Sequence, residues 1–302
     1  MLTRSARLEP ECRARVSTPS VDPEPETSRV LTAPALAMRN GLVQVLRIGL
    51  LKTGDTADNV KNEFGDFDAM FQRELFLNAG GPDVQIAVAE SHRGELLPKG
   101  SVDAVVVTGS PHSVTRPEPW THALAAWLRD VHELGTPILG VCYGHQILAD
   151  AFGGRVEENP RGYEVGTVDV RLTEEGRRDP LLGTLGERER LIFHAVHSDA
   201  VTLLPRGGVL LADNAGSEVQ AFRVGDHTWG VQFHPEFTDG IMRAYVEARL
   251  SRIEADAVRR GLDFNQRLEH VRSSIHPAPL GRRLLHRFLE LALQTRLRRI
   301  PG

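Results

Sequence analysis

A cysteine and its immediate neighbours form the segment of this chain best suited to covalent chemistry. Residues 140–146 read Gly-Val-Cys-Tyr-Gly-His-Gln and lie between an apolar run that predicts a buried strand and a segment that predicts a helix. A nucleophile on a sharp strand-to-helix turn needs small neighbours, because the turn strains the backbone and brings strand and helix close together. Gly140 and Gly144 supply them, and the start of a helix favours a thiolate. We predict Cys142 as a nucleophile; the alternative is a buried structural thiol.

A histidine and a glutamate far downstream are the natural partners of that cysteine. Residues 230–236 read Gly-Val-Gln-Phe-His-Pro-Glu at the end of a predicted strand. A cysteine nucleophile needs a base within hydrogen-bond reach, and the base needs a third group to orient it. His234 and Glu236 can fill these roles, because residues i and i+2 of an extended segment point to one side. The triplet His-Pro-Glu is weak alone, but together with Cys142 it predicts a catalytic triad.

The elements that would position these residues alternate between strand and helix. β-Branched and apolar runs predict strands at 46–51, 84–90, 102–107 and 137–141, and helical spacing appears at 66–77 and 120–134. This alternation predicts an α/β fold in three layers (α/β/α), with a mostly parallel sheet covered on both faces. Closely spaced strands predict a mixed or antiparallel extension, at 165–172, 191–196, 209–212, 219–224 and 228–233. Helices are expected at 240–260 and 279–299.

Both motifs resemble those of class I (triad-type) glutamine amidotransferases. Residues 140–146 are similar to the nucleophile elbow of GMP-synthase glutaminase domains, and residues 230–236 to the family's His/Glu segment. Residues 197–201, His-Ser-Asp-Ala-Val, resemble the His-x-Asp-x-Val segment of that branch. The loop at 108–111 and the turn at 225–227 resemble stand-alone γ-glutamyl peptidases of the family. The likeness spans about residues 46–249 and implies the family's flavodoxin-like fold.

The resemblance also implies a mechanism. Cys142 would attack a γ-glutamyl amide carbon, His234 would move the proton, and water would hydrolyse the resulting γ-glutamyl thioester. The tetrahedral oxyanion needs two hydrogen-bond donors. One is expected from the backbone N–H of Tyr143, and the other from the loop at 108–111, at Gly109 or Ser110.

Substrate-binding residues are implied by the same likeness. Gln146 would lie beside the glutamyl group; the alternative is a polar residue on a helix face. His197 and Asp199 would line the pocket for the α-amino and carboxylate groups; the alternative is a hydrogen-bonded pair within a loop. The spacing of His194 and His197 could suggest a metal site, but no carboxylate or thiol cluster accompanies them, so we expect neither metal nor cofactor.

Composition excludes several other classes of protein. The 302 residues carry 36 Lys and Arg against 40 Asp and Glu, a net charge of −4, which argues against a dedicated nucleic-acid binder. Two cysteines, Cys12 and Cys142, cannot build a disulfide scaffold. No apolar run approaches the roughly 18–20 residues of a membrane span. We therefore expect a cytoplasmic protein with neither nucleic acid nor a membrane as its partner.

Three regions are expected along the chain. Residues 1–42 are polar, proline-containing and aperiodic, which predicts a disordered tail, unless translation begins at Met38. Residues 43–250 are expected to form the catalytic domain, since Cys142 and His234 must meet. Residues 251–302 are expected to form a C-terminal helical extension.

Several functions remain open at this stage. The chain could hydrolyse a γ-glutamyl conjugate by itself, or it could be a glutaminase that passes ammonia to a separate synthetase chain, since no ATP-binding loop is visible. A non-catalytic binding or regulatory protein normally loses part of the triad. Cysteine hydrolases of the intracellular peptidase/chaperone family lack a strand-borne His-Pro-Glu, so Glu236 argues against them. Recognition of the leaving group is expected from loops near 55–64 and 111–119.

Overall fold

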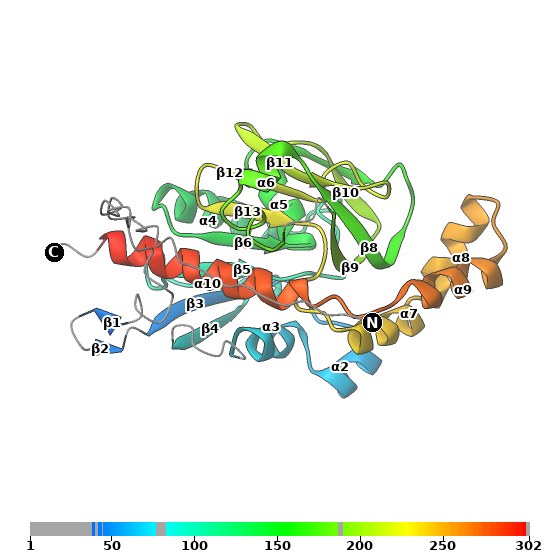
Figure 1. Ribbon diagram of the computed structural model, residues 1–302, viewed down its shortest axis with the longest axis horizontal. Coiled ribbons are helices and arrows are strands. Elements are labelled where there is room, and N and C mark those ends of the chain that lie inside the picture. Colours follow the sequence, from blue (N-terminus) through cyan, green and yellow to red (C-terminus); the bar gives the residue numbers. More distant parts are fainter. Residues whose placement is uncertain (1–37, 40–41, 44, 77–82, 187–189, 300–302) are drawn as a thin grey trace, which may run out of the picture. The chain divides into compact units, whose positions relative to one another are not determined.

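The central sheet contains strands from both halves of the chain. The computed structural model describes residues 38–299, apart from 40–41, 44, 77–82 and 187–189. Among these residues, nine strands form one sheet (Figure 1), in the order β4 (Val84–Glu90), β3 (Leu46–Lys52), β5 (Ala104–Val107), β6 (Ile138–Val141), β13 (Thr228–Val231), β12 (Ala221–Val224), β11 (Gly208–Asp213), β8 (Glu164–Leu172), β9 (Arg190–His197). Neighbours from β4 to β13 pair in parallel, and those from β13 to β9 pair antiparallel. The expected α/β class, with its mostly parallel sheet and mixed extension, is confirmed.

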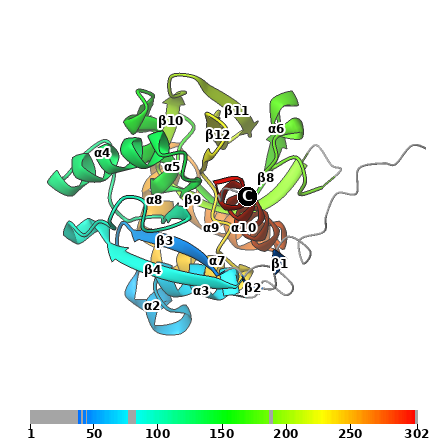
Figure 2. The same cartoon turned by 90° about the vertical axis from the view of Figure 1, so that its left-hand side faces the viewer.

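Helices cover the parallel strands on both faces. Helices α4 (Pro119–Glu133) and α5 (Tyr143–Ala151) pack on one face, while α3 (Phe67–Phe76) and α10 (Leu280–Arg299) pack on the other. Figure 2 shows α4 and α5 on the opposite side of the sheet from α10. Successive residues of β5 enter the two cores alternately, so that the whole strand is buried. This explains why its sequence is a continuous apolar run.

Helix α10 belongs to the core, although it lies far beyond the last strand in sequence. It buries Leu284, Phe288 and Leu289 completely. The rings of Phe288 and of Trp229 in β13 form a T-shaped pair, with the ring centroids 6.3 Å apart. A buried Glu74 of α3 accepts a 2.7 Å hydrogen bond from Arg282. Residues 280–299, which fall within the expected extension at 251–302, therefore help to hold the sheet that carries the site.

Replacing Phe288 with alanine is expected to lower the free energy of unfolding by about 3–5 kcal/mol, because it removes a fully buried ring and leaves a cavity. Chemical denaturation measures this change. Val258→Ala is the matched control, since Val258 is 75% exposed and its truncation should cost less than about 0.5 kcal/mol. Equal stabilities of the two variants would show that α10 does not contribute to the core.

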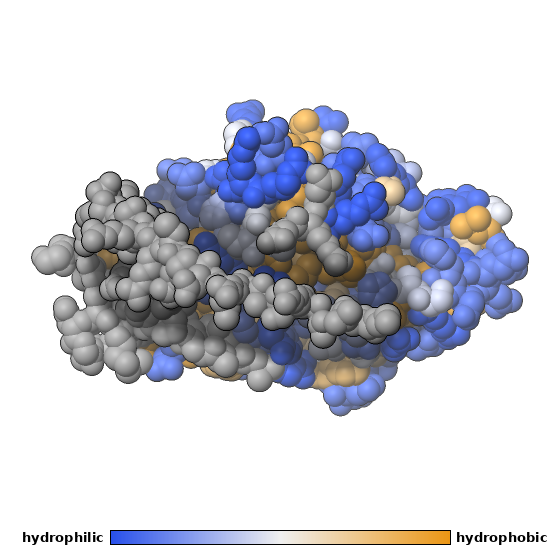
Figure 3. Space-filling model, viewed as in Figure 1, coloured by the Kyte–Doolittle hydropathy of each residue, from blue (hydrophilic) through white to orange (hydrophobic). Residues whose placement is uncertain are grey.

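Four further helices flank the carboxyl ends of the strands. They are α2 (Asp58–Phe64), α7 (Asp239–Ala248), α8 (Leu250–Arg259) and α9 (Phe264–Ser274). They share a third apolar cluster that includes Met242, Ile253 and Val271. On the face shown in Figure 3 these helices are mainly hydrophilic, with small hydrophobic patches, one of them near the end of α8, where Val258 and Leu262 are exposed.

Some elements differ from the expectations. The helix expected at 240–260 is interrupted at Arg249, and part of the loop expected at 55–64 is helix α2. Helix α9 was not expected, although Asp263 caps it by accepting a hydrogen bond from Gln266 N. Two short strands, β7 (Arg155–Glu158) and β10 (Asp199–Leu203), pair apart from the main sheet. Helix α6 (Glu174–Arg178) precedes β9, and the 3-10 turn η1 (Ser91–Arg93) follows β4.

The expected tail at 1–42 lies outside the described residues except at its end. There, β1 (Met38–Arg39) pairs antiparallel with β2 (Leu42–Val43). Across the described part of the chain, no helix has both the length and the apolar character that crossing a membrane requires.

Candidate active site

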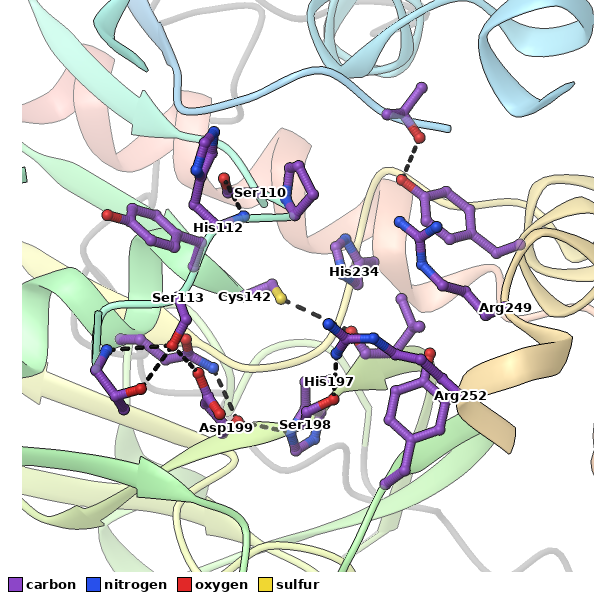
Figure 4. Close-up of a pocket in the computed structure, with 18 of the residues that line it drawn as sticks. Ser110, His112, Ser113, Cys142, His197, Ser198, Asp199, His234, Arg249 and Arg252 are labelled. Atoms are coloured by element: carbon purple, nitrogen blue, oxygen red, sulfur yellow. Dashed lines mark hydrogen bonds between the residues drawn. The ribbon is translucent and has the colours of Figure 1, made fainter. Parts of the chain in front are cut away.

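A cavity of about 580 Å³ lies beside the carboxyl ends of the parallel strands. In an open parallel sheet this is the edge where ligands bind. Cys142 follows β6, the loop with Ser110 follows β5, and His234 follows β13. All three residues line the cavity (Figure 4). The two predicted motifs are therefore brought to one place by neighbouring strands.

The backbone at Cys142 is strained. Its φ of 53° makes it the only non-glycine residue with positive φ in the described part of the chain. Its N–H donates a 2.9 Å hydrogen bond to Val231 O, which ties the turn to β13. A Cβ on Gly140 would lie 2.3 Å from Gly144 O, and one on Gly144 would lie 2.4 Å from Val107 O. Both glycines are therefore required by the close approach of strand and helix, and the strain is concentrated at the cysteine.

His234 is fixed on one ring nitrogen and unpaired on the other. Its Nδ1 lies 2.7 Å from Glu236 Oε1, and both side chains are buried, at 3% and 0% exposure. The ring stacks on Phe237 with centroids 4.1 Å apart, and the backbone N–H donates to His194 O at 2.8 Å. The buried Nε2 has no hydrogen-bond partner among the described residues. Figure 4 shows Cys142 and His234 next to each other in the cavity.

Charge around His234 favours the protonated ring. Burial alone would lower its pKa, but the carboxylate of Glu236 and then Cys142 outweigh burial and raise the pKa of His234 to about 10. A histidine held in this way keeps its proton at neutral pH and can deliver it to a leaving nitrogen.

The loop after β5 presents backbone donors beside the cysteine. A Cβ on Gly109 would lie 2.8 Å from His234 Cε1 and 3.6 Å from Cys142 Cβ. Thr53 Oγ1 donates both to Thr108 O at 3.0 Å and to Gly109 O at 2.9 Å. Because a trans peptide points N–H opposite to C=O, the N–H groups of Gly109 and Ser110 point away from Thr53. Neither they nor the N–H of Tyr143 has a partner among the described residues. Their role as oxyanion donors remains a prediction.

The three predicted substrate-binding residues meet around one backbone carbonyl. Asp199 O accepts hydrogen bonds from Gln146 Nε2 at 2.8 Å and from His197 Nδ1 at 2.9 Å. His197 Nε2 lies 2.7 Å from Glu164 Oε2, so both ring nitrogens are engaged within the protein. The carboxylate of Asp199 lines the cavity, where Ser113 Oγ donates to it. Direct contact with a ligand therefore remains a prediction that fits Asp199 and Gln146 better than His197.

Glu164, whose side chain is 9% exposed, is a residue that the sequence analysis missed. It accepts hydrogen bonds from Asn214 Nδ2 at 2.7 Å and from Gln220 Nε2 at 2.6 Å, in addition to the contact with His197. Burial opposes its charge, but these hydrogen bonds and the charge of His197 lower the pKa of Glu164. It fixes His197, and through it the carbonyl of Asp199. The sequence around Glu164 does not indicate this role, because its hydrogen-bond partners come from distant segments of the chain.

Two arginines were also missed. Both line the cavity, Arg249 from the interruption between α7 and α8 and Arg252 from the first turn of α8. The guanidinium carbon of Arg249 lies 5.7 Å from the centre of the Tyr245 ring, and Arg252 Nη1 donates a 2.6 Å hydrogen bond to Ser198 Oγ. They were missed because a single helix was expected over this segment.

One cluster among the described residues has the spacing of a metal site. It consists of Asp55, Glu90 and His92, with ligand atoms within 4.8 Å of one another. The ammonium of Lys52 already lies 2.5 Å from Asp55 Oδ1 and 3.4 Å from Glu90 Oε1. A cation of the protein's own therefore neutralises these carboxylates, and the cluster does not fit a metal ion.

Comparison with known proteins supports the family that the two motifs suggested. The sequence profile described as "Glutamine amidotransferase class-I" matches residues 73–250, more than half of the chain. A putative glutamine amidotransferase-like protein of Schizosaccharomyces pombe is 30% identical over 196 residues, covering 64% of this chain and 76% of the relative. The chain belongs to the class I glutamine amidotransferase family.

Other relatives differ in their named activities. Gamma-glutamyl peptidase 3 of Arabidopsis thaliana is 29% identical over 49% of this chain and 60% of its own length. GMP synthase [glutamine-hydrolyzing] of Aeropyrum pernix is 39% identical over 47% of this chain and 25% of its own length. The chain thus spans less than two thirds of these two relatives. The crystal structure of a glutamine amidotransferase from Thermotoga maritima shares the fold, with a TM-score of 0.60 at 20% identity, covering 82% of this chain and 98% of that one.

Proposed function

We propose that this protein hydrolyses γ-glutamyl amides through a thioester on Cys142, with His234 as the acid–base group and Glu236 as its orienting carboxylate. The observation that carries the proposal is the arrangement of three buried groups. A cysteine on a strained turn adjoins a histidine whose other nitrogen lies 2.7 Å from a buried glutamate. This is the general arrangement of nucleophile, base and orienting group in covalent hydrolysis.

The reaction balances without a cofactor. The thiolate of Cys142 forms an S–C bond to the γ-carbonyl carbon, and negative charge moves to the carbonyl oxygen beside the N–H groups of Tyr143 and Gly109 or Ser110. When the intermediate collapses, the C–N bond breaks and the leaving nitrogen takes the proton of His234. Neutral His234 then removes a proton from water, the hydroxide adds to the thioester, and the C–S bond breaks. The products are glutamate and an amine, or ammonia if the substrate is glutamine.

A second candidate keeps the same chemistry but requires another chain. The resemblance to a quarter of a glutamine-hydrolysing GMP synthase supports a glutaminase whose ammonia passes to a separate synthetase. The two candidates differ in what the isolated protein can do. A free-standing hydrolase turns over its substrate alone, whereas a glutaminase that serves a synthetase is nearly silent until its partner is added.

The test is to incubate the isolated protein with glutamine and a panel of γ-glutamyl peptides, and to measure glutamate and amine release. Acid quenching during turnover, followed by mass spectrometry of proteolytic peptides, should locate a γ-glutamyl adduct on the peptide that contains Cys142. Turnover with no adduct at any stage, or an adduct on Cys12 alone, would contradict the mechanism. Turnover of glutamine that appears only with an added synthetase would favour the second candidate.

A further inference from the structure

The cavity beside Cys142 has unpaired positive charge on one side. Arg249 and Arg252 both line it, and Figure 4 shows their side chains reaching into it from the helical side. Arg252 donates to the hydroxyl of Ser198, and Arg249 contacts the Tyr245 ring and donates to Ala248 O at 3.4 Å. In the described part of the chain, neither guanidinium forms an ion pair with a carboxylate. Their hydrogen-bonding capacity is therefore mostly unused.

The acidic groups that line the same cavity are already engaged. Asp55 pairs with Lys52 at 2.5 Å, and Asp199 accepts a hydrogen bond from Ser113. Glu158 pairs with Arg259, which does not line the cavity. None of these carboxylates pairs with Arg249 or Arg252, so both guanidinium groups remain able to pair with an anionic group of a ligand.

These arginines lie close to the reacting cysteine. Cys142 Sγ is 3.9 Å from Val196 O, and Ser198, which holds Arg252, is only two residues further along the chain. The pKa of the buried Tyr163 hydroxyl is affected by all three groups. Burial raises its pKa to about 12, Arg249 and Arg252 oppose the rise, and Cys142 adds to it. A ligand held at Cys142 therefore occupies the same cavity as the two guanidinium groups.

A γ-glutamyl substrate can carry an anionic group either on its glutamyl part or on its leaving group. The carboxylate of Asp199 lies at the cavity in a cluster with Gln146 and suits the α-ammonium of the glutamyl group. A cavity of about 580 Å³ belongs to the size range that encloses a whole small ligand, so it has room for a leaving group as well as a glutamyl group. The two arginines enter the cavity from the region of α7 and α8, whereas Asp199 enters it from the start of β10.

Building on the proposed function, we propose that Arg249 and Arg252 form a carboxylate-binding subsite for the leaving group. The favoured substrates would then be γ-glutamyl amides of amino acids or short peptides, which retain a carboxylate beyond the scissile bond, rather than glutamine. Guanidinium groups suit this role because they bind carboxylates through paired, charge-assisted hydrogen bonds.

The experiment compares γ-Glu-Gly and γ-Glu-Ala-Gly with the same peptides carrying a neutral C-terminal amide. For the wild-type protein we expect kcat/KM to be about tenfold or more higher for the free acid in at least one pair. Arg249→Gln, Arg252→Gln and the double variant should lower this acid-to-amide ratio toward one, losing rate on the acids while keeping it on the amides. Arg260→Gln removes a charge from the end of α8 outside the cavity and should leave the ratio unchanged.

Activity on the neutral amides shows that each variant is folded. Equal wild-type rates on acid and amide in both pairs would overturn the subsite while leaving the proposed hydrolysis intact. Equal losses on acid and amide in the arginine variants would place the arginines at the glutamyl α-carboxylate and would also overturn the proposal. Failure to hydrolyse any γ-glutamyl compound would contradict the proposed function, and the subsite with it.

Discussion

Replacing Cys142 with alanine is expected to reduce kcat by about 10⁴-fold or more, because the variant can form no thioester and keeps only the binding and oxyanion contributions. Cys142→Ser should be similarly inactive, since the hydroxyl is a far weaker nucleophile in a site shaped for a larger sulfur. Steady-state glutamate release on the best substrate of the panel measures the effect.

Folding should not explain that loss. Cys142 is small, and alanine removes only its sulfur, so we expect a change in the free energy of unfolding of about 1 kcal/mol at most. Cys12→Ala removes the other cysteine of the sequence and is the matched control, expected to retain full activity. If Cys142→Ala retained more than a few per cent of wild-type turnover, the covalent mechanism would have to be abandoned.

Replacing Glu236 with glutamine is expected to lower kcat by about 10³-fold or more. The side chain keeps its shape and still reaches His234 Nδ1, but it loses the charge that stabilises the imidazolium. A glutamine amide can also donate to Nδ1, which favours the wrong tautomer of the ring. Glu254→Gln, at an exposed position of α8, is the control and should be silent.

The same variant should change the pH dependence in a defined direction. In the wild-type protein Glu236 raises the pKa of His234 against the effect of burial, so the proton is kept until alkaline pH. Removing the carboxylate lowers that pKa, because burial is then less opposed. The alkaline limb of kcat/KM, where His234 loses the proton needed by the leaving nitrogen, should therefore move to lower pH. A limb that stays in place would show that Glu236 does not act on His234.

Local sequence was sufficient to identify the candidate reacting groups that the structure brings together. The glycines on either side of Cys142 indicate a tight turn between a strand and a helix, and the structure shows that a Cβ on Gly140 or Gly144 would meet backbone. His234 and Glu236 are two residues apart as expected, but the segment is a turn and not extended, with a 3.3 Å hydrogen bond from Phe237 N to His234 O. This turn brings the two side chains together. Adjacent parallel strands then bring the two motifs together, because β6 and β13 pair in register at Val141 and Val231.

The cavity walls were harder to predict, because they depend on contacts between distant segments. Arg249 is exposed to the cavity only because the helical run stops there, and neither proline nor glycine marks the interruption. His197 resembled a ligand-binding residue by motif, yet Glu164 in β8 occupies its second nitrogen. Such pairings between strands leave no local pattern. A motif therefore indicates which residues gather at the site better than it indicates which of them face the ligand.

The contact between His234 and β9 has a consequence for folding. The N–H of His234 bonds to His194 O, so the segment after β13 is held by the strand at the far end of the sheet order. Such long-range contacts form late, since their loop-closure entropy must be overcome first. A partly folded chain would therefore carry its cysteine without its base. On the proposed mechanism, thioester formation at Cys142 is then expected only in the completed fold, where His234 is in place beside it.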